Sequence, residues 1–149
     1  MEQAMRCARL VGVAVAGLLL CGASAAAEAD IVVVVANSSA VKVLTRSQVA
    51  DIFLGKVNRF PDGGQATPVD QPEGAATRDE FYSTFTGKSP AQIKAHWSKI
   101  IFTGRGQPPQ VVTSSAEVKK RIAENPETIG YIEASEVDGS VRALPPAPQ

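Results

Sequence analysis

The chain alternates short apolar segments with stretches whose apolar residues recur at helical spacing. Asp30 to Asn37 (DIVVVVAN) is a continuous β-branched run, which is typical of a strand buried on both faces in a mainly parallel sheet. We expect it to be the central strand. Further strands are predicted at Thr67 to Asp70, Val111 to Val112, Thr128 to Glu133 and Val141 to Leu144.

Four amphipathic helices are predicted between these strands. Capping-box residues mark the start of two of them, at Thr45 and Ser114, and a serine followed by proline marks a third at Ser89. The helices are expected from Thr45 to near Gly55, from about Thr77 to Phe85, from Ser89 to about Ile101, and from Ser114 to Asn125. Strands that alternate with helices in this way predict a three-layer α/β domain.

The N-terminal segment has the pattern of an export signal. Basic residues precede an apolar run from Leu10 to Leu20, and the small-residue stretch GASAAAEA follows. Cleavage is favoured after Ala27, with Ala29 as the alternative site. We therefore expect a signal peptide over residues 1–27, a domain over residues 28–145, a disordered tail over residues 146–149, and a mature protein in the periplasm.

The two cysteines, Cys7 and Cys21, both lie within the expected signal peptide. A lipoprotein signal at Cys21 is disfavoured because Leu20, which is not a small residue, precedes it. The mature chain is thus predicted to lack thiols and disulfides, and packing must stabilise it.

The charge composition bears on the choice of partner. The chain has 15 basic and 15 acidic residues, which gives a formal net charge of zero. No overall field favours nucleic acid or an anionic membrane, so any recognition of anions has to be local. We expect no nucleic-acid partner.

The most informative segment is PEGAATRDEFY, Pro72 to Tyr82, in which a glycine-containing turn joins a short strand to a helix. The backbone N–H groups of Ala75 to Arg78, which follow Gly74, would then point at one spot together with the Thr77 hydroxyl and the Arg78 guanidinium. Unpaired N–H groups at a helix start favour anions. The segment therefore predicts an anion-binding site.

Other polar residues are candidates for ligand binding, catalysis or metal binding. Ser38 and Ser39 follow the first strand and could add hydroxyl donors to the anion site. Asp70 and Glu73 place two carboxylates nearby, yet no nucleophile arrangement accompanies them, so we expect no enzyme activity. His96 is the sole histidine, and zinc or copper needs several converging ligands, so no metal or cofactor is predicted.

Several segments in the same order resemble the periplasmic phosphate-binding proteins of ABC transporters, and most of all their short single-domain relatives. These segments are LTRSQVADIFLGKVNRFPDG, PEGAATRDEF, KSPAQIKAHWSKIIFTGRG and NPETIGYI. The resemblance implies a single periplasmic-binding-protein-like lobe with a mixed, mainly parallel sheet and helices on both faces. It also implies phosphate or a similar small oxyanion as ligand and an ABC transporter permease as partner.

In full-length members of the family, a run resembling R-x-D-x-S-G-T at a helix start holds the anion. By position, Gln71 stands where the arginine would be and Glu73 where the aspartate would be. Ala75, Ala76 and Thr77 stand where Ser-Gly-Thr would be, so Thr77 alone is identical. The resemblance implies that Glu73 accepts a proton from the bound anion.

Two functional hypotheses follow. The first is a periplasmic solute-binding protein of phosphate-binding type that holds a small oxyanion for transport. The second is a single-lobe interaction or sensor module with a degenerate ligand site, which the residues at Gln71, Ala75 and Ala76 motivate. Because one lobe cannot close on a ligand alone, the site is expected to be an open shelf, or a second copy in a homodimer supplies the other wall.

Overall fold

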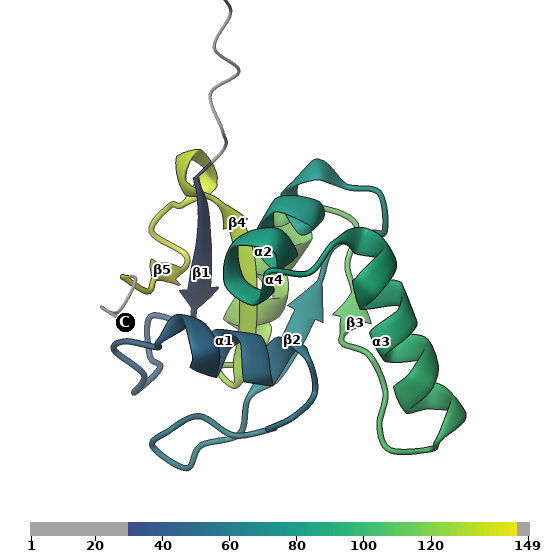
Figure 1. The fold of residues 1–149 in the computed structure, drawn as a ribbon. Coiled ribbons are helices and arrows are strands. Elements are labelled where there is room, and N and C mark those ends of the chain that lie inside the picture. The colour runs from purple at the N-terminus through teal and green to yellow at the C-terminus, as the bar shows by residue number, and fades with distance from the viewer. Residues whose placement is uncertain (1–29, 146–149) are drawn as a thin grey trace, which may run out of the picture.

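The computed structural model describes residues 30–145, so the predicted signal peptide, Cys21 and the tail lie outside the described residues. Five strands form one mixed sheet in the order β3-β2-β4-β1-β5 (Figure 1). The predicted α/β class and mixed sheet are confirmed. The strands are β1 (Ile31–Val35), β2 (Thr67–Asp70), β3 (Gln110–Val111), β4 (Thr128–Glu133) and β5 (Arg142–Ala143).

The position expected for the first strand is wrong. β1 lies one strand from the edge and is antiparallel to both neighbours, β4 and β5, whereas β4 is the central strand. β2 is parallel to β4 and β3. The β-branched run of β1 reports burial on both faces, which helices supply here for an antiparallel strand as well, so the run did not specify the pairing.

The helices begin and end within a few residues of their predicted bounds. They are α1 (Arg46–Phe53), α2 (Ala76–Thr86), α3 (Pro90–Phe102) and α4 (Ser115–Glu124), and a short 3₁₀ helix η1 (Ala134–Glu136) follows β4. Full capping boxes form at Thr45 and Ser89. At Ser114 only half of the predicted box forms, because the Ser114 hydroxyl accepts from the Glu117 N–H while the Glu117 carboxylate pairs with Arg121.

The sheet separates two apolar cores. On one face α1, α2 and α3 bury aromatic side chains, among them Phe53, Phe81 and Trp97, against β1 and β4. On the other face Val118 and Ile122 of α4 pack against β1, β2 and β4. The molecule is therefore three-layered, as predicted, with one helix on one side and three on the other.

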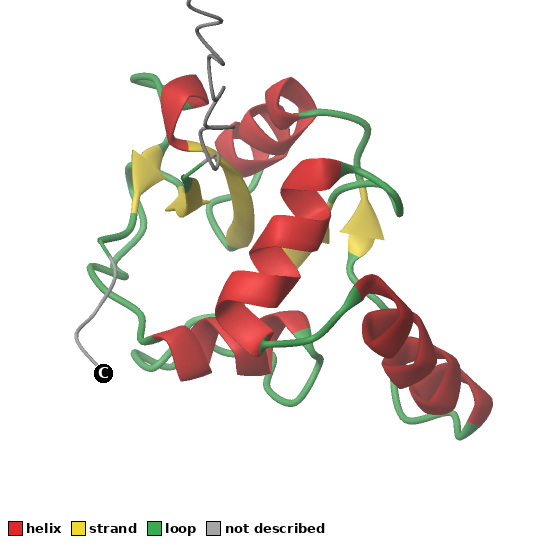
Figure 2. Cartoon of the chain, turned by 45° about the horizontal axis from the view of Figure 1, so that its top comes forward, coloured by secondary structure: helices red, strands yellow, loops and turns green. Residues whose placement is uncertain are grey.

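The first half of helix α3 packs against the core, whereas its last turn extends into solvent. Trp97 is 6% exposed and contacts Gly55, whose φ of 73° already requires glycine, and the His96 Nε2 lies 2.9 Å from the Leu54 carbonyl oxygen. The far end of α3 and the loop after it stand apart from the sheet (Figure 2). Ile101, which marks the predicted end of this helix, is 55% exposed there.

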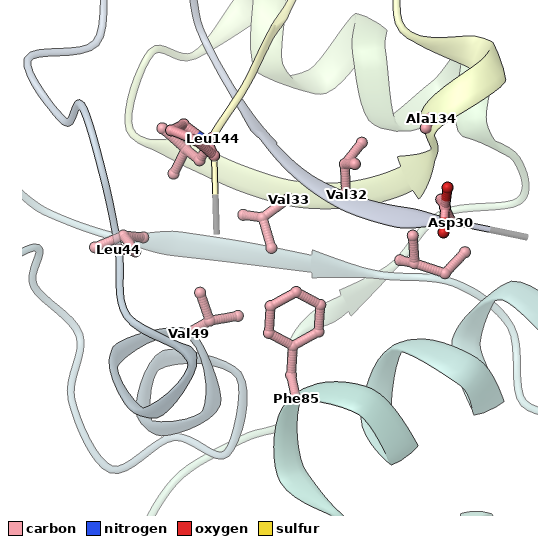
Figure 3. A pocket seen from close by; sticks show the side chains of 10 residues that line it. Asp30, Val32, Val33, Leu44, Val49, Phe85, Ala134 and Leu144 are labelled. Atoms are coloured by element: carbon pink, nitrogen blue, oxygen red, sulfur yellow. The ribbon is translucent and has the colours of Figure 1, made fainter. Parts of the chain in front are cut away.

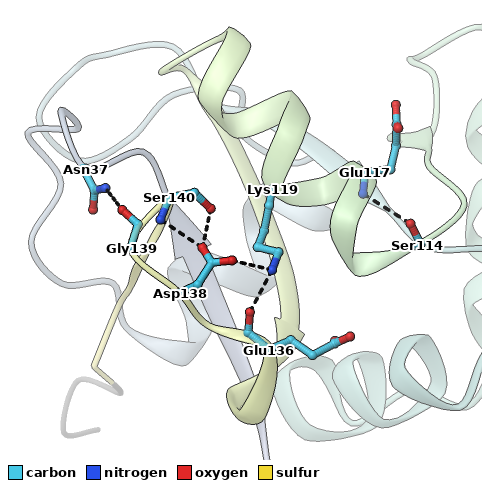
Figure 4. Close-up of polar contacts among 8 residues, drawn as sticks. All are labelled: Asn37, Ser114, Glu117, Lys119, Glu136, Asp138, Gly139 and Ser140. Carbon is cyan, nitrogen blue, oxygen red and sulfur yellow. Dashed lines mark hydrogen bonds and ion pairs between the residues drawn. The ribbon is translucent and has the colours of Figure 1, made fainter.

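Polar contacts hold the segment after η1 against α4 (Figure 4). The Lys119 ammonium donates to the Asp138 carboxylate at 2.7 Å and to the Glu136 carbonyl at 3.1 Å. The Asn37 side chain donates to the Gly139 carbonyl at 2.8 Å. Hydrogen bonds from Lys119 and then from Ser140 lower the pKa of Asp138 well below its usual range. These contacts fix the chain between β4 and β5.

Gly130 is expected to be the least tolerant glycine of the sheet. A Cβ atom there would lie 2.5 Å from a Val118 side-chain carbon and 3.1 Å from one of Val69. Gly130→Ala should therefore push α4 off β4 and lower the free energy of unfolding by about 1–3 kcal/mol, measured by urea denaturation. Gly139→Ala is the matched control, because nothing lies within 4 Å of its Cβ position. Equal stability of the two variants would contradict this packing.

Candidate functional site

The predicted anion site is the turn from β2 into α2. The Ala75 N–H bonds to the Pro72 carbonyl at 3.0 Å, and Gly74 has a φ of 88°, which favours glycine. Ala75 is the N-cap residue and offers no side-chain acceptor to the helix. The sequence thus builds a tight turn whose last residue leaves the helix start uncapped.

The start of α2 has unpaired backbone donors. Asp79 is the first residue of the helix whose N–H reaches a backbone carbonyl, that of Ala75 at 3.1 Å. Among residues 30–145, no hydrogen-bond acceptor is found for the N–H groups of Ala76, Thr77 and Arg78. Ala76 is exposed and Thr77 is partly exposed. Such a helix start carries partial positive charge and can hold an anion.

Directly behind this turn lies a buried carboxylate, Asp70, which is 2% exposed. The Tyr82 hydroxyl donates to it at 2.8 Å, the Gln71 N–H donates at 2.8 Å, and the Tyr131 hydroxyl also donates. Arg78 forms an ion pair with it, with Nε 3.2 Å from Oδ2. Both carboxylate oxygens are therefore occupied by donors from β4, from α2 and from Gln71, which directly follows β2.

Burial and charge together shift the pKa values of this cluster. Burial first, and then the charge of Asp70, raise the pKa of Tyr82 and of Tyr131 far above the usual range, so both remain protonated donors. Burial lowers the pKa of Arg78, but the attraction to the Asp70 carboxylate outweighs burial, so the pKa of Arg78 is raised overall. The cluster is a fixed arrangement of one carboxylate, one guanidinium and two phenols.

Arg78 therefore has a partner that the sequence reading did not name. The segment Pro72 to Tyr82 predicts the Arg78 guanidinium over the anion spot. Instead its side chain is 11% exposed, pairs with Asp70 and lies over the Tyr82 ring, with Cζ 5.0 Å from the centroid. Its charge stays next to the helix start, but Asp70 neutralises much of it.

The two residues that stand where the family has arginine and aspartate are also engaged. Gln71 is buried, and its side-chain amide donates to the Tyr131 carbonyl at 3.1 Å. Glu73 is solvent-exposed and pairs with Lys94 of α3 at 3.3 Å. Neither side chain is anchored over the start of α2.

The structure does not bring Ser38 and Ser39 to the same place. β1 runs antiparallel to β4, whereas β2 runs parallel to it, so the carboxyl ends of β1 and β2 lie at opposite ends of the sheet. Ser38 and Ser39 follow β1, and Gly74 to Arg78 follow β2. The expectation that Ser38 and Ser39 add donors to the anion site holds only for parallel strands, and β1 is antiparallel to β4, so the expectation is wrong.

The sequence did contain a signal for the buried cluster. Arg78 and Tyr82 are four residues apart and so share one face of α2, and Asp70 ends an otherwise apolar strand next to that helix. A charged residue at such a position is rarely buried unless it is paired. These two features together predict that Arg78 and Tyr82 contact a buried Asp70.

The sequence matches no protein-family model and no curated protein. Solved structures of similar fold include proteins from three bacteria. A Clostridium perfringens protein assigned as a phosphate ABC transporter substrate-binding protein, solved with bound phosphate, is 26% identical with a TM-score of 0.63. An ABC-type phosphate transport receptor from Vibrio cholerae is 23% identical (TM-score 0.61), and PstS from Borrelia burgdorferi is 14% identical (TM-score 0.59).

These matches cover 78 to 81% of this chain but only 44 to 49% of the other chains. The chain therefore spans about half the length of the structures it resembles. Its structure is similar to that of phosphate ABC transporter substrate-binding proteins, and its mixed α/β sheet corresponds to one lobe of them. Among residues 30–145, no helix is long and apolar enough to cross a membrane.

Removing the charge of Asp70 should destabilise the fold. Asp70→Asn leaves Arg78 almost buried without its counter-charge, so the free energy of unfolding should fall by about 3 kcal/mol. Glu73→Gln removes an exposed ion pair and should change it by less than about 0.5 kcal/mol. Urea denaturation measures both, and a loss at Asp70 no larger than that at Glu73 would contradict the role given to this carboxylate.

The tyrosines predict a loss of stability at alkaline pH. Because their pKa values are raised in the folded state, the unfolded chain releases these protons first, and stability falls as pH rises above about 10. Two such groups give a slope of about 2.7 kcal/mol per pH unit. The full slope is reached about one pH unit above the unfolded-state pKa of about 10, so unfolding should be measured between roughly pH 9 and pH 12, and Tyr131→Phe should halve the slope at the alkaline end. An unchanged slope would count against burial of the phenol.

Proposed function

We propose that this protein is a solute-binding protein of phosphate-binding type, which holds a small oxyanion at the start of α2 for an ABC transporter in the periplasm. The observation that carries the proposal is the set of unpaired N–H groups of Ala76, Thr77 and Arg78. The structural similarity to a phosphate ABC transporter substrate-binding protein supports this proposal, because the part of that protein that matches is a lobe of the same fold.

The chemistry of the proposed site follows from its donors. Three backbone N–H groups and the Thr77 hydroxyl can each donate to one oxygen of a tetrahedral anion, and Gly74 and Ala75 let the anion approach the backbone. Arg78 adds positive charge from the side, in a position that Asp70 holds constant. Binding is reversible, and no covalent bond is made or broken.

A second candidate is an interaction or sensor module without a transport role. The specific observation in its favour is that Gln71 and Glu73, which stand where the family has its charged ligands, are bound to Tyr131 and Lys94 instead. This candidate predicts no heat when phosphate or sulfate is titrated into the protein. The same titration therefore separates the two candidates.

Ala76→Pro removes one proposed donor while leaving the helix in place. Ala76 is the first residue of α2, where proline is tolerated, and Ala75 has φ −70° and ψ 130°, which suit the residue before a proline. One lost hydrogen bond to a charged ligand, worth about 1.5–3 kcal/mol, should weaken phosphate or sulfate binding by roughly tenfold to a hundredfold in isothermal titration calorimetry.

The matched control is Ser115→Pro, the same change at the first residue of α4, which lies on the other face of the sheet. It should leave anion binding unchanged. Unfolding curves establish that both variants fold. The proposal fails if the unmodified protein gives no heat with either anion up to millimolar concentration, or if Ala76→Pro binds as tightly as the unmodified protein.

A further inference from the structure

The end of α3 presents an apolar tip to solvent. Phe102 is 92% exposed and Ile101 is 55% exposed, at the end of the helix that stands farthest from the sheet (Figure 2). Lys99 lies one helical turn before Phe102, and Arg105 follows in the loop. Neither cation forms an ion pair with any residue in the described part of the chain.

Two cations lie near this tip. Residues 87–116 contain four lysines or arginines and no acidic residue, although the chain as a whole is neutral. Lys88 precedes α3 and Lys94 pairs with Glu73, so Lys99 and Arg105 are the two that remain near the tip. The remainder of the chain therefore carries the compensating negative charge. A protruding aromatic ring with cations on both sides is suited to an apolar pocket that has an acidic rim.

The same chain contains such a pocket at the other end of the sheet. It has a volume of about 290 Å³ and is lined mainly by apolar side chains of β1, α1, α2 and the segment after β5. Val33, Val49 and Phe85 point toward one another across it, and the Asp30 carboxylate lies at one end (Figure 3). For comparison, an apolar cavity of roughly 150 Å³ already accepts benzene.

A second carboxylate faces the same side. Glu133 pairs in register with Ile31, which lines the pocket, and directly paired residues of antiparallel strands project to the same face. Among residues 30–145, neither Asp30 nor Glu133 forms an ion pair. Within residues 30–145, Asp30 in the pocket lining and Glu133 on the same face of the sheet thus form no ion pair, and neither do Lys99 and Arg105 near the tip.

We propose that Phe102 of one copy of this protein inserts into the pocket formed by Val33, Val49 and Phe85 of a second copy, with Lys99 and Arg105 next to Asp30 and Glu133. The tip cannot fill the pocket of its own chain, because α3 lies beside β3 and the pocket lies beside β1 and β5, at opposite edges of the sheet. Insertion in both directions gives a closed two-fold dimer.

A second copy explains more of these features than an anionic membrane does. A membrane would accept Phe102 and its flanking cations but would leave the acidic pocket without a partner. A second copy buries the ring, fills the pocket and pairs both sets of charges. This inference is independent of the proposed anion site, since the tip and the pocket contain none of the residues at the start of α2.

Sedimentation velocity of the protein expressed from its full sequence tests this inference over a concentration series. The unmodified protein should form dimers. Phe102→Ser should raise the dimer dissociation constant at least about a hundredfold, because two rings leave apolar surroundings in each dimer. Val57→Ser is the matched control, since Val57 is 45% exposed and lies in neither the tip nor the pocket. It should leave the dissociation constant unchanged.

Reversing the charges of the tip and of the pocket in separate variants tests the pairing directly. Lys99→Glu with Arg105→Glu, and separately Asp30→Lys with Glu133→Lys, should each abolish dimers, whereas a mixture of the two proteins should restore them at physiological salt. The mixture should fail when the first protein also carries Phe102→Ser. A protein that remains monomeric at every concentration, or a mixture that stays monomeric, overturns the proposal. So does a monomer that binds phosphatidylglycerol vesicles through Phe102.

Discussion

The structure depends on one buried carboxylate. Asp70 ends β2 beneath the turn into α2 and receives hydrogen bonds from Tyr82, Tyr131 and the Gln71 N–H in addition to its ion pair with Arg78. A buried charge is tolerated only when such partners compensate for the lost hydration. Because Asp70 ends β2 and its donors come from β4, α2 and Gln71, the carboxylate ties the central strand, its parallel neighbour and the helix above them into one geometry.

That geometry bears directly on the candidate site. Fixing Arg78 and Tyr82 fixes the rotation of α2 about its own axis, and hence the direction in which its free N–H groups point. A site built from backbone donors needs such positioning, since the backbone cannot adjust to a ligand as a flexible side chain can. Asp70 therefore has a positioning role, and its charge reduces the positive field that Arg78 would otherwise add for an anion.

Local signals in the sequence predicted local structure well. Capping residues located α1 and α3, and the apolar segment TIGYIE matched β4 residue for residue. What the sequence did not specify was the pairing of β1, because a β-branched run records burial and not strand direction. The expected convergence of Ser38 and Ser39 with Thr77 depended on that direction. The ion pair of Arg78 with Asp70 was not predicted either. Asp70 was grouped with Glu73 as a carboxylate near the anion site, and its burial was not expected.

The chain spans about half the length of the solved structures of similar fold. Within residues 30–145, an apolar pocket lies beside β1 and an aromatic tip lies at the end of α3. Charges of opposite sign that form no ion pair with the described residues lie near each of them. Exposing the tip and the pocket costs hydrophobic free energy that contact between copies would recover. Because the tip and the pocket lie at opposite edges of the sheet, the proposed contact joins two copies of the chain and is not formed within one copy.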